Sequence, residues 1–122
     1  MKVLIVDDED DIRRIARIAL GKVGKMDVVE AASGTEAVRR ATEERPDAIL
    51  LDVMMPGLDG PSTLAALRSQ PSTASLPVVF LTAKAMPAEV ERLKDLGARG
   101  VLLKPFDPMT LAADLQAVLK GH

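Results

Sequence analysis

The sequence places carboxyl, hydroxyl and amine side chains directly after four short apolar runs. The runs and the groups that end them are Lys2–Val6 with Asp7 and Asp8, Ala48–Leu51 with Asp52, Pro77–Leu81 with Thr82, and Gly100–Leu103 with Lys104. Short aliphatic runs without alternation are typical of strands in a buried parallel sheet. The carboxyl ends of all strands in such a sheet face one edge, where ligands bind. We therefore expect three carboxylates, one hydroxyl and one amine to meet in a single pocket.

The three carboxylates predict a cation site. Carboxylates that lie close together repel each other and raise each other's pKa unless a cation lies between them. The chain has no cysteine and its one histidine is His122, so the candidate ligands are oxygen atoms. Such ligands favour Mg²⁺ or a similar ion such as Mn²⁺. The backbone carbonyl of Met54, in the loop after Asp52, is expected to lie near this metal.

Each of these residues also has an ordinary structural interpretation. The acidic residues 9–11 suit the first turn of a helix, where acids complement the helix dipole. Asp52 is also a common turn residue, Thr82 a strand-end hydroxyl and Lys104 a solvated surface lysine. Taken together, however, the groups form a receptor for an anion with several oxygens. A phosphoryl group fits, because metal, lysine and hydroxyl would bind its equatorial oxygens while a carboxylate attacks in line.

Patterns of strand and helix alternate five times, which is typical of an α/β fold with a doubly wound parallel sheet. Residues 27–31 form a further, weaker strand. The positions that we expect to face the core in successive helices are Ile12, Ile15, Ala16, Ala19, Leu20 and Val23; Ala37, Val38 and Ala41; Leu64, Ala65 and Leu67; Val90, Leu93 and Leu96; and Leu111, Leu115, Val118 and Leu119.

Capping and breaking residues predict where these helices begin and end. The first helix is expected to stop near Gly24, and the second to begin at Ser33 and end before Pro46. Pro61 is expected in the first turn of the third helix. The fourth helix is expected to run from Pro87 to a left-handed cap at Gly97, and the last to have Asp107 as its N-cap.

Length and charge restrict the class of protein. The 122 residues indicate one domain, which we assign to residues 1–120; Gly121 and His122 are either native or the start of a purification tag. A net charge of −2 gives no electrostatic basis for binding nucleic acid or an anionic membrane. No apolar run approaches the roughly 18 residues that span a bilayer, and the first is too short for a secretory signal. We therefore expect a cytoplasmic protein without disulfides.

Five short motifs follow one another along the chain. They are Val6-Asp7-Asp8, Leu51-Asp52-Val-Met-Met-Pro56, Asp59-Gly60, Leu81-Thr82-Ala83-Lys84 and Lys104-Pro105-Phe106. In this order and at this spacing they resemble the response-regulator receiver domain of two-component signalling, particularly the single-domain chemotaxis type. The resemblance covers essentially the whole chain. It implies a flavodoxin-like fold with five helices and five parallel strands in the order 2-1-3-4-5, so that the strand at 27–31 lies on an edge.

The resemblance also implies a role for each acid of the site. Asp52 would be the phosphoacceptor, taking a phosphoryl group from a histidine kinase, a phosphotransfer protein or a small phosphodonor. Asp8, Asp52 and the Met54 carbonyl would bind Mg²⁺ directly, and Asp7 would act mainly through bound water.

The remaining two site residues would contact the phosphoryl group itself. By the same resemblance Thr82 would hydrogen-bond its oxygens and Lys104 would pair with them. The peptide bond between Lys104 and Pro105 would be cis, which costs only about 0.5–1 kcal/mol before proline. Such a domain catalyses its own phosphorylation and dephosphorylation and is not a conventional enzyme.

Three positions bear on how this chain would signal. Val101 stands where the family usually has an aromatic ring that swings inward, and a stiff valine cannot make that movement. We therefore expect the loop after Thr82 to carry the response. Met54 and Lys84, each two residues beyond a site residue, are predicted to set the lifetime of the phosphoaspartate, although both are also ordinary exposed loop residues.

Three other functions compete with this interpretation. Phosphatases with an aspartyl nucleophile have an Asp-x-Asp motif at the end of the first strand. This chain has Asp7-Asp8-Glu9 there and is too short for a cap domain. A nucleotide or flavin module would need a Gly-x-Gly-x-x-Gly turn, which is absent. The third alternative is a receiver fold that binds its partner constitutively, without phosphotransfer. Val101, in place of the usual aromatic residue, is compatible with this function.

The downstream partner is a protein that the sequence does not identify. The face formed by the fourth helix, the last strand and the last helix is the usual docking face of the family. Arg92, Lys94 and Arg99 lie in or near it, where they are equally well explained as solvated charges. We expect a monomer or a weak homodimer.

Overall fold

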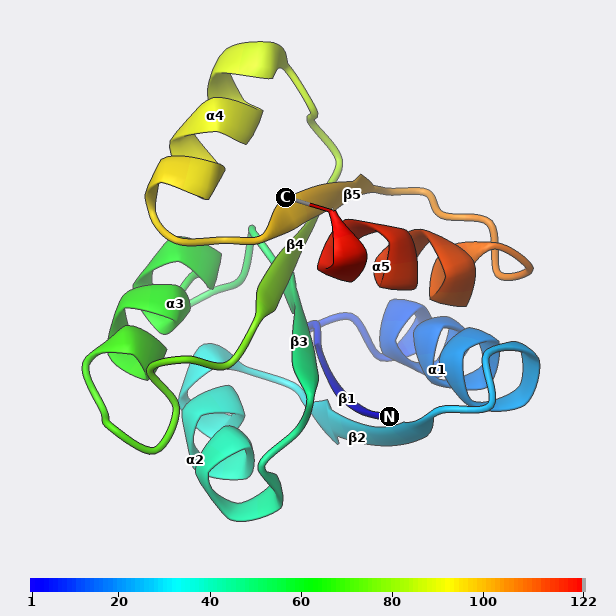
Figure 1. The fold of residues 1–122 in the computed structure, drawn as a ribbon, viewed down its shortest axis with the longest axis horizontal. Coiled ribbons are helices and arrows are strands. Elements are labelled where there is room, and N and C mark those ends of the chain that lie inside the picture. The colour runs from blue at the N-terminus through cyan, green and yellow to red at the C-terminus, as the bar shows by residue number, and fades with distance from the viewer. Residues whose placement is uncertain (122) are drawn as a thin grey trace.

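The computed structural model describes residues 1–121 and has a parallel sheet with helices on both faces (Figure 1). The strands are β1 (Lys2–Val6), β2 (Asp27–Ala31), β3 (Ala48–Asp52), β4 (Val78–Thr82) and β5 (Gly100–Leu103). The helices are α1 (Asp10–Ile18), continued by a turn of π-helix, η1 (Ala19–Val23), then α2 (Gly34–Glu44), α3 (Gly60–Arg68), α4 (Pro87–Asp95) and α5 (Leu111–Lys120).

The sheet order is β2-β1-β3-β4-β5, and all four pairs of neighbours are parallel. This confirms the flavodoxin-like order that the resemblance implies. It places β2 on one edge and puts β1 beside β3, so that Asp7, which follows β1, lies near Asp52, which ends β3. The carboxyl ends of β1, β3 and β4 therefore meet in the middle of one sheet edge, as doubly wound topology requires.

The central strands are apolar up to their last residues because helices cover both of their faces. Leu50 and Leu51 are adjacent in β3 and both fully buried, yet they belong to two different cores. The first core, around Leu51 and Phe80, lies under α2, α3 and α4. The second core, around Leu50 and Leu20, lies under α1, η1 and α5. The alternation of a strand thus divides its side chains between the two helical layers.

Most of the predicted helix boundaries are confirmed. The Ser33 hydroxyl accepts a hydrogen bond from the Glu36 amide at 3.1 Å and so caps α2. The Asp59 carboxylate caps α3 in the same way, accepting from the Ser62 amide at 2.8 Å. Gly97 has φ +112°, the left-handed conformation expected after α4.

The prediction that Asp107 caps the last helix is wrong. The helix begins at Leu111, and its N-cap is Thr110. Asp107 instead closes a separate turn: its carboxylate accepts from the Met109 amide at 2.8 Å, and its carbonyl accepts from the Thr110 amide at 3.1 Å. An aspartate before a proline serves an Asx turn as well as it serves a helix, and here the turn precedes the helix.

Four residues that we expected to face the core are exposed: Ile15, Val23, Ala65 and Leu96. The first helix packs through a narrow stripe that includes Ala16 and Ala19, because small side chains let the helix lie close to the sheet. Leu96 follows the last residue of α4 and turns away before Gly97. None of the helices within residues 1–121 has the length and apolar character needed to cross a membrane.

Candidate functional site

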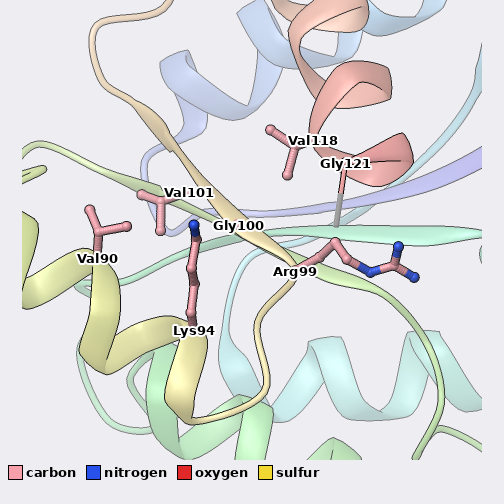
Figure 2. Close-up of a pocket in the computed structure, with 7 residues that line it drawn as sticks. All are labelled: Val90, Lys94, Arg99, Gly100, Val101, Val118 and Gly121. Atoms are coloured by element: carbon pink, nitrogen blue, oxygen red, sulfur yellow. The ribbon is translucent and has the colours of Figure 1, made fainter.

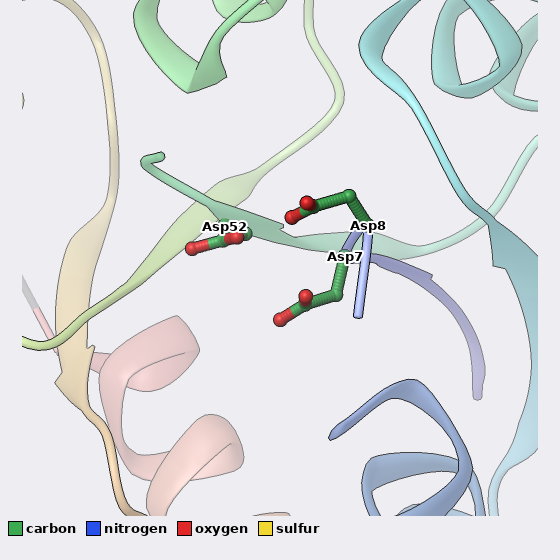
Figure 3. A group of neighbouring side chains, drawn as sticks. All are labelled: Asp7, Asp8 and Asp52. Carbon is green, nitrogen blue, oxygen red and sulfur yellow. The ribbon is translucent and has the colours of Figure 1, made fainter. Parts of the chain in front are cut away.

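Asp7, Asp8 and Asp52 gather at the carboxyl edge of the sheet, where β1 and β3 lie side by side (Figure 3). One carboxylate oxygen from each lies within 4.8 Å of the others. Asp7 is fully buried and Asp52 is 4% exposed, whereas Asp8 faces solvent. Three carboxylates at this separation repel one another and require a counter-charge. Water cannot screen the repulsion well, because Asp7 and Asp52 are buried.

Lys104 provides part of that counter-charge. Its ammonium lies 2.7 Å from Oδ2 of Asp7 and 3.3 Å from Oδ1 of Asp52. The lysine reaches this position because its amide donates to the Thr82 carbonyl at 2.8 Å, which ties the end of β5 to the end of β4. The bond between Lys104 and Pro105 is cis, as the resemblance implies.

The electrostatic balance of the site raises the pKa of the Asp52 carboxyl to about 6 in the metal-free protein. Burial is the largest cause and the charge of Asp7 adds to it, while Lys104 and the Met54 amide act in the opposite direction. The pKa of Lys104 itself is raised: burial alone would lower it, but Asp7 and Asp52 together outweigh that effect. A single lysine therefore does not neutralise the acid cluster.

The donor set of the cluster suits a hard divalent cation. All three ligand candidates are carboxylates, and no nitrogen or sulfur competes with them. Oδ2 of Asp7 is buried, and it contacts the ammonium of Lys104 at 2.7 Å as an ion pair. It retains acceptor capacity inside the site. Met54 follows Asp52 closely, and its amide lies 3.4 Å from the Asp52 Oδ1.

Thr82 ends β4 beside Asp52 and is 5% exposed. Its hydroxyl bonds to the following loop: it donates to the Lys84 carbonyl at 3.2 Å and accepts from the Lys84 amide at 3.1 Å. The sequence suggested a hydroxyl directed at the anion, whereas in this structure the hydroxyl bonds to the main chain of Lys84. A movement of the hydroxyl toward the carboxylates would therefore release the loop.

Sequence reasoning missed the network that supports the acids from behind. The Arg13 guanidinium donates to the Asp7 carbonyl at 2.8 Å and pairs with Asp10 at 2.6 Å and Glu30 at 3.1 Å. It thereby connects α1, the end of β1 and the edge strand β2. The spacing of Asp10 and Arg13, three residues apart on one helix, was the only signal for it in the sequence.

Val101, which replaces the usual aromatic residue, is half-buried on β5 and lines a shallow pocket between α4 and the end of α5 (Figure 2). Figure 2 shows Lys94 reaching from α4 toward β5. Arg99 turns away from α4 and donates to the Leu119 carbonyl at 2.9 Å. Arg92 pairs with Glu89 at 2.6 Å. Of the three cations on this face, Arg92 and Arg99 are thus held by partners within the fold, whereas Lys94 lines the pocket.

Comparison with known proteins identifies the class of this fold and site. The model of the response regulator receiver domain matches residues 3–116, and the chain belongs to that family of two-component signalling domains. Among solved structures, the chemotaxis protein CheY4 of Vibrio cholerae superposes with a TM-score of 0.88 at 39% identity, covering 96% of this chain and 97% of that one. The receiver domain of the Francisella response regulator 1452 gives 0.86 at 31%, covering 98% and 96%.

Curated relatives include longer proteins. The alkaline phosphatase synthesis transcriptional regulatory protein PhoP of Bacillus subtilis is 39% identical over 119 residues, which cover 98% of this chain and 48% of PhoP. The transcriptional regulatory protein PrrA of Mycobacterium tuberculosis is 39% identical over 120 residues, covering 98% and 50%. The chain thus spans about half the length of these relatives. Receiver domains generally bind Mg²⁺ at an acidic pocket, and this chain has an acidic cluster of that kind.

Proposed function

We propose that this domain, over residues 1–120, takes a phosphoryl group onto Asp52 in a Mg²⁺-dependent reaction and changes its affinity for a partner protein when it does so. The observation that carries the proposal is the ammonium of Lys104 between two buried carboxylates, with Asp8 and Asp52 in one acidic cluster. A salt bridge that served stability alone would have no need of two further acids at the same point.

Asp52 is the nucleophile in this proposal. Its carboxylate oxygen attacks phosphorus in line, the bond from phosphorus to the donor atom breaks, and an acyl phosphate forms. Because the pKa of Asp52 is raised to about 6, a positive neighbour favours the ionised carboxylate that attacks phosphorus. The ammonium of Lys104 then pairs with an oxygen of the new phosphoryl group, and the Thr82 hydroxyl donates a hydrogen bond to another of its oxygens.

Asp8, Asp52 and the main-chain carbonyl of Met54 would hold the Mg²⁺, with Asp7 acting through bound water. A bound Mg²⁺ would neutralise charge on the phosphoryl oxygens as they approach the acids. Asp7 would also keep Lys104 in place, since its Oδ2 lies 2.7 Å from the Lys104 ammonium.

The first experiment measures intact mass after incubation with Mg²⁺ and either acetyl phosphate or phosphoramidate. A single phosphoryl adduct is expected, and both EDTA and Asp52→Asn should abolish it. Mass is the appropriate measurement because the chain has no tryptophan whose fluorescence could report binding. No adduct, under conditions in which a known receiver domain reacts, would leave a constitutive binding module as the better explanation.

The proposed partners follow from the same chemistry. Donors would be a histidine kinase, a phosphotransfer protein or a small phosphodonor. The output would be a change in affinity for a downstream protein, and coupling of Thr82 to the Lys84 main chain offers a route for it that does not need an aromatic at Val101. Amide signals of residues 83–106 that stay unaltered on phosphorylation would exclude this route.

Magnesium should stabilise the fold more at pH 7.5 than at pH 5. The Asp52 carboxyl has its pKa raised from 3.8 to about 6, so its contribution favours folding below 3.8 and is lost as the pH rises through about 6. Above that pH the ionised acid is free to bind metal without displacing a proton. A Mg²⁺ concentration of 100 times Kd adds about 2.7 kcal/mol to the free energy of unfolding. Thermal melts in Mg²⁺ and in EDTA at both pH values measure the difference.

Asp52→Asn serves as the control for this measurement, because it removes the titrating carboxyl and one ligand together. Its melting temperature in EDTA should lose the part of the pH dependence that lies between about pH 4 and 6. If Mg²⁺ raises the melting temperature of the unsubstituted protein equally at the two pH values, the carboxyl that binds the metal is not the one with the raised pKa.

The side chains of Met54 and Lys84 are expected to set the lifetime of the phosphoaspartate. Met54 is 78% exposed and Lys84 is exposed, and both line the pocket beside Thr82 through which water would approach. Replacing each with a small polar residue should change the rate of dephosphorylation several-fold, measured as loss of the adduct mass after the donor is removed. Decay at the unaltered rate in both variants would show that neither residue controls access of water.

A further inference from the structure

The peptide group between Asp7 and Asp8 lies just beyond the end of β1. The Asp7 amide donates to the Ala31 carbonyl at 3.2 Å and so continues the pairing of β1 with β2 by one bond. The Asp7 carbonyl accepts a hydrogen bond from the Arg13 guanidinium at 2.8 Å. Because a peptide group is planar, fixing this carbonyl also fixes the direction of the Asp8 amide. The bond to Arg13 therefore bears on the direction in which Asp8 leaves the strand.

Asp8 is the acid of the cluster whose direction depends most on its main chain. Asp7 is fully buried and Asp52 is nearly so, and their surroundings restrict both side chains. Asp8 is exposed, so packing does not restrict its side chain in the same way. Its carboxylate nevertheless turns toward Asp52 (Figure 3). A rotation of the peptide group before Asp8 would turn this carboxylate away from the other two.

The guanidinium of Arg13 is held in a defined orientation. Its three nitrogens donate to three different elements: Nη2 to Asp10 on α1 at 2.6 Å, Nε to Glu30 on β2 at 3.1 Å, and Nη1 to the Asp7 carbonyl. The side chain is only 16% exposed. A guanidinium is planar and presents its N–H donors in a fixed fork, so three partners together determine its position. Arg13 is thus a rigid support for the peptide group after β1.

We infer that Arg13 is a positioning residue of the proposed Mg²⁺ site, an inference that rests on the proposed function. Arg13 bonds to the main chain of Asp7 rather than to its carboxylate. By holding the peptide group between Asp7 and Asp8, it keeps the Asp8 carboxylate directed at Asp52 before a cation binds. Residues that orient metal ligands from behind typically contribute a factor of about 10–100 to metal affinity.

Charge and positioning predict opposite effects of removing Arg13. The guanidinium is a positive charge near the acids, so its loss would tighten the binding of a divalent cation if charge alone mattered. The loss also leaves Asp10 and Glu30 without this cation, which adds to the attraction for a metal ion. If Arg13 acts by holding the peptide group, its loss weakens Mg²⁺ binding instead. The direction of the change in affinity therefore identifies the role.

The test is a Mg²⁺ titration without any phosphodonor, followed by the amide NMR signals of Asp8 and Glu9. Arg13→Ala should raise the Mg²⁺ concentration at half-saturation by about tenfold to 100-fold. Arg17→Ala is the matched control. Arg17 lies one turn further along the same helix and pairs with the same Glu30 at 3.1 Å. Its removal should leave the half-saturation concentration unaltered.

A second measurement follows the main chain in the metal-free protein. The Glu9 amide donates to Oδ1 of Asp7 at 2.9 Å, a bond that depends on the same peptide group. Its hydrogen exchange should be faster in Arg13→Ala than in Arg17→Ala. With phosphoramidate as donor, the phosphorylation rate of Arg13→Ala should need more Mg²⁺ yet approach the normal maximum at saturation. A general folding defect would lower the maximum without changing the Mg²⁺ dependence.

Unaltered or tighter Mg²⁺ binding by Arg13→Ala would overturn the inference, as would an equal weakening in Arg17→Ala. The inference and the proposed function can fail separately. If Arg13→Ala binds Mg²⁺ more weakly but the unsubstituted protein forms no adduct at Asp52, the positioning role of Arg13 stands and the proposed phosphorylation is wrong. If the adduct forms and the two arginine variants bind Mg²⁺ equally well, the phosphorylation stands and the role of Arg13 is wrong.

Discussion

Replacing Lys104 with methionine is expected to slow phosphorylation of Asp52 by about 100-fold, the usual cost of removing one positioned donor from an anionic transition state. Methionine keeps most of the volume of the side chain, so the main loss is the charge. The ammonium is 2.7 Å from Asp7 and 3.3 Å from Asp52, and no other cation pairs with either of these acids within residues 1–121. The rate is measured as the growth of the adduct mass with phosphoramidate.

The same variant should bind Mg²⁺ at least as tightly as the unsubstituted protein, because Lys104 competes with the metal for the two carboxylates. Rate and affinity would then move in opposite directions, which an unfolded or distorted variant cannot produce. Lys94→Met is the matched control, since Lys94 lies on α4 away from the acids and should leave both quantities unaltered. A Lys104 variant that reacts within a few-fold of the normal rate would remove this lysine from the proposed mechanism.

Gly60→Ala should destabilise the fold by about 3 kcal/mol, at the upper end of the usual cost of overpacking. A Cβ at this position would lie 2.5 Å from the Asp52 carbonyl oxygen and 2.8 Å from the Val53 Cα. Both atoms belong to the main chain, where a shift is costly, and Phe80 closes the third side at 3.0 Å. The start of α3 would have to move away from the end of β3, which lowers the melting temperature by roughly 10 °C.

Gly21→Ala is the appropriate comparison for that variant. Its Cβ would meet no atom closer than 3.8 Å, and the position is helical, so alanine should be neutral or slightly stabilising there. Thermal and denaturant unfolding of both variants give the difference. If the two glycines tolerate alanine equally well, close packing of α3 against Asp52 is not what holds the β3 end in place.

The strands and the residues at their ends were the features best predicted from the sequence. The strands β1, β3 and β4 were readable because they are buried on both faces and are therefore apolar except at their ends. The resemblance to receiver domains implied the strand order, which the structure confirms. The helices were located less well in detail: Ile15 and Leu96 fit the helical spacing, yet both are exposed, because spacing alone does not say how wide the packed stripe is.

Polar details were the least predictable. A sequence cannot distinguish an aspartate that caps a helix from one that closes a turn, and Asp107 does the latter. It also does not say where a hydroxyl points. The bonds of Thr82 to the Lys84 main chain depend on the conformation of a loop. The support of Asp7 by Arg13 and Glu30 joins residues that are 17 apart in the chain, which no local pattern predicts.

The sequence by itself determined the kind of chemistry: which acids, which amine and which hydroxyl stand at strand ends, and that the ligands are oxygens. These follow from residue type and from the common direction of parallel strands. Only the tertiary structure decided the electrostatics. The burial of Asp7 and Asp52 and the position of Lys104 between them arise from side chains on different elements, and their energies depend on distance and on exclusion of water.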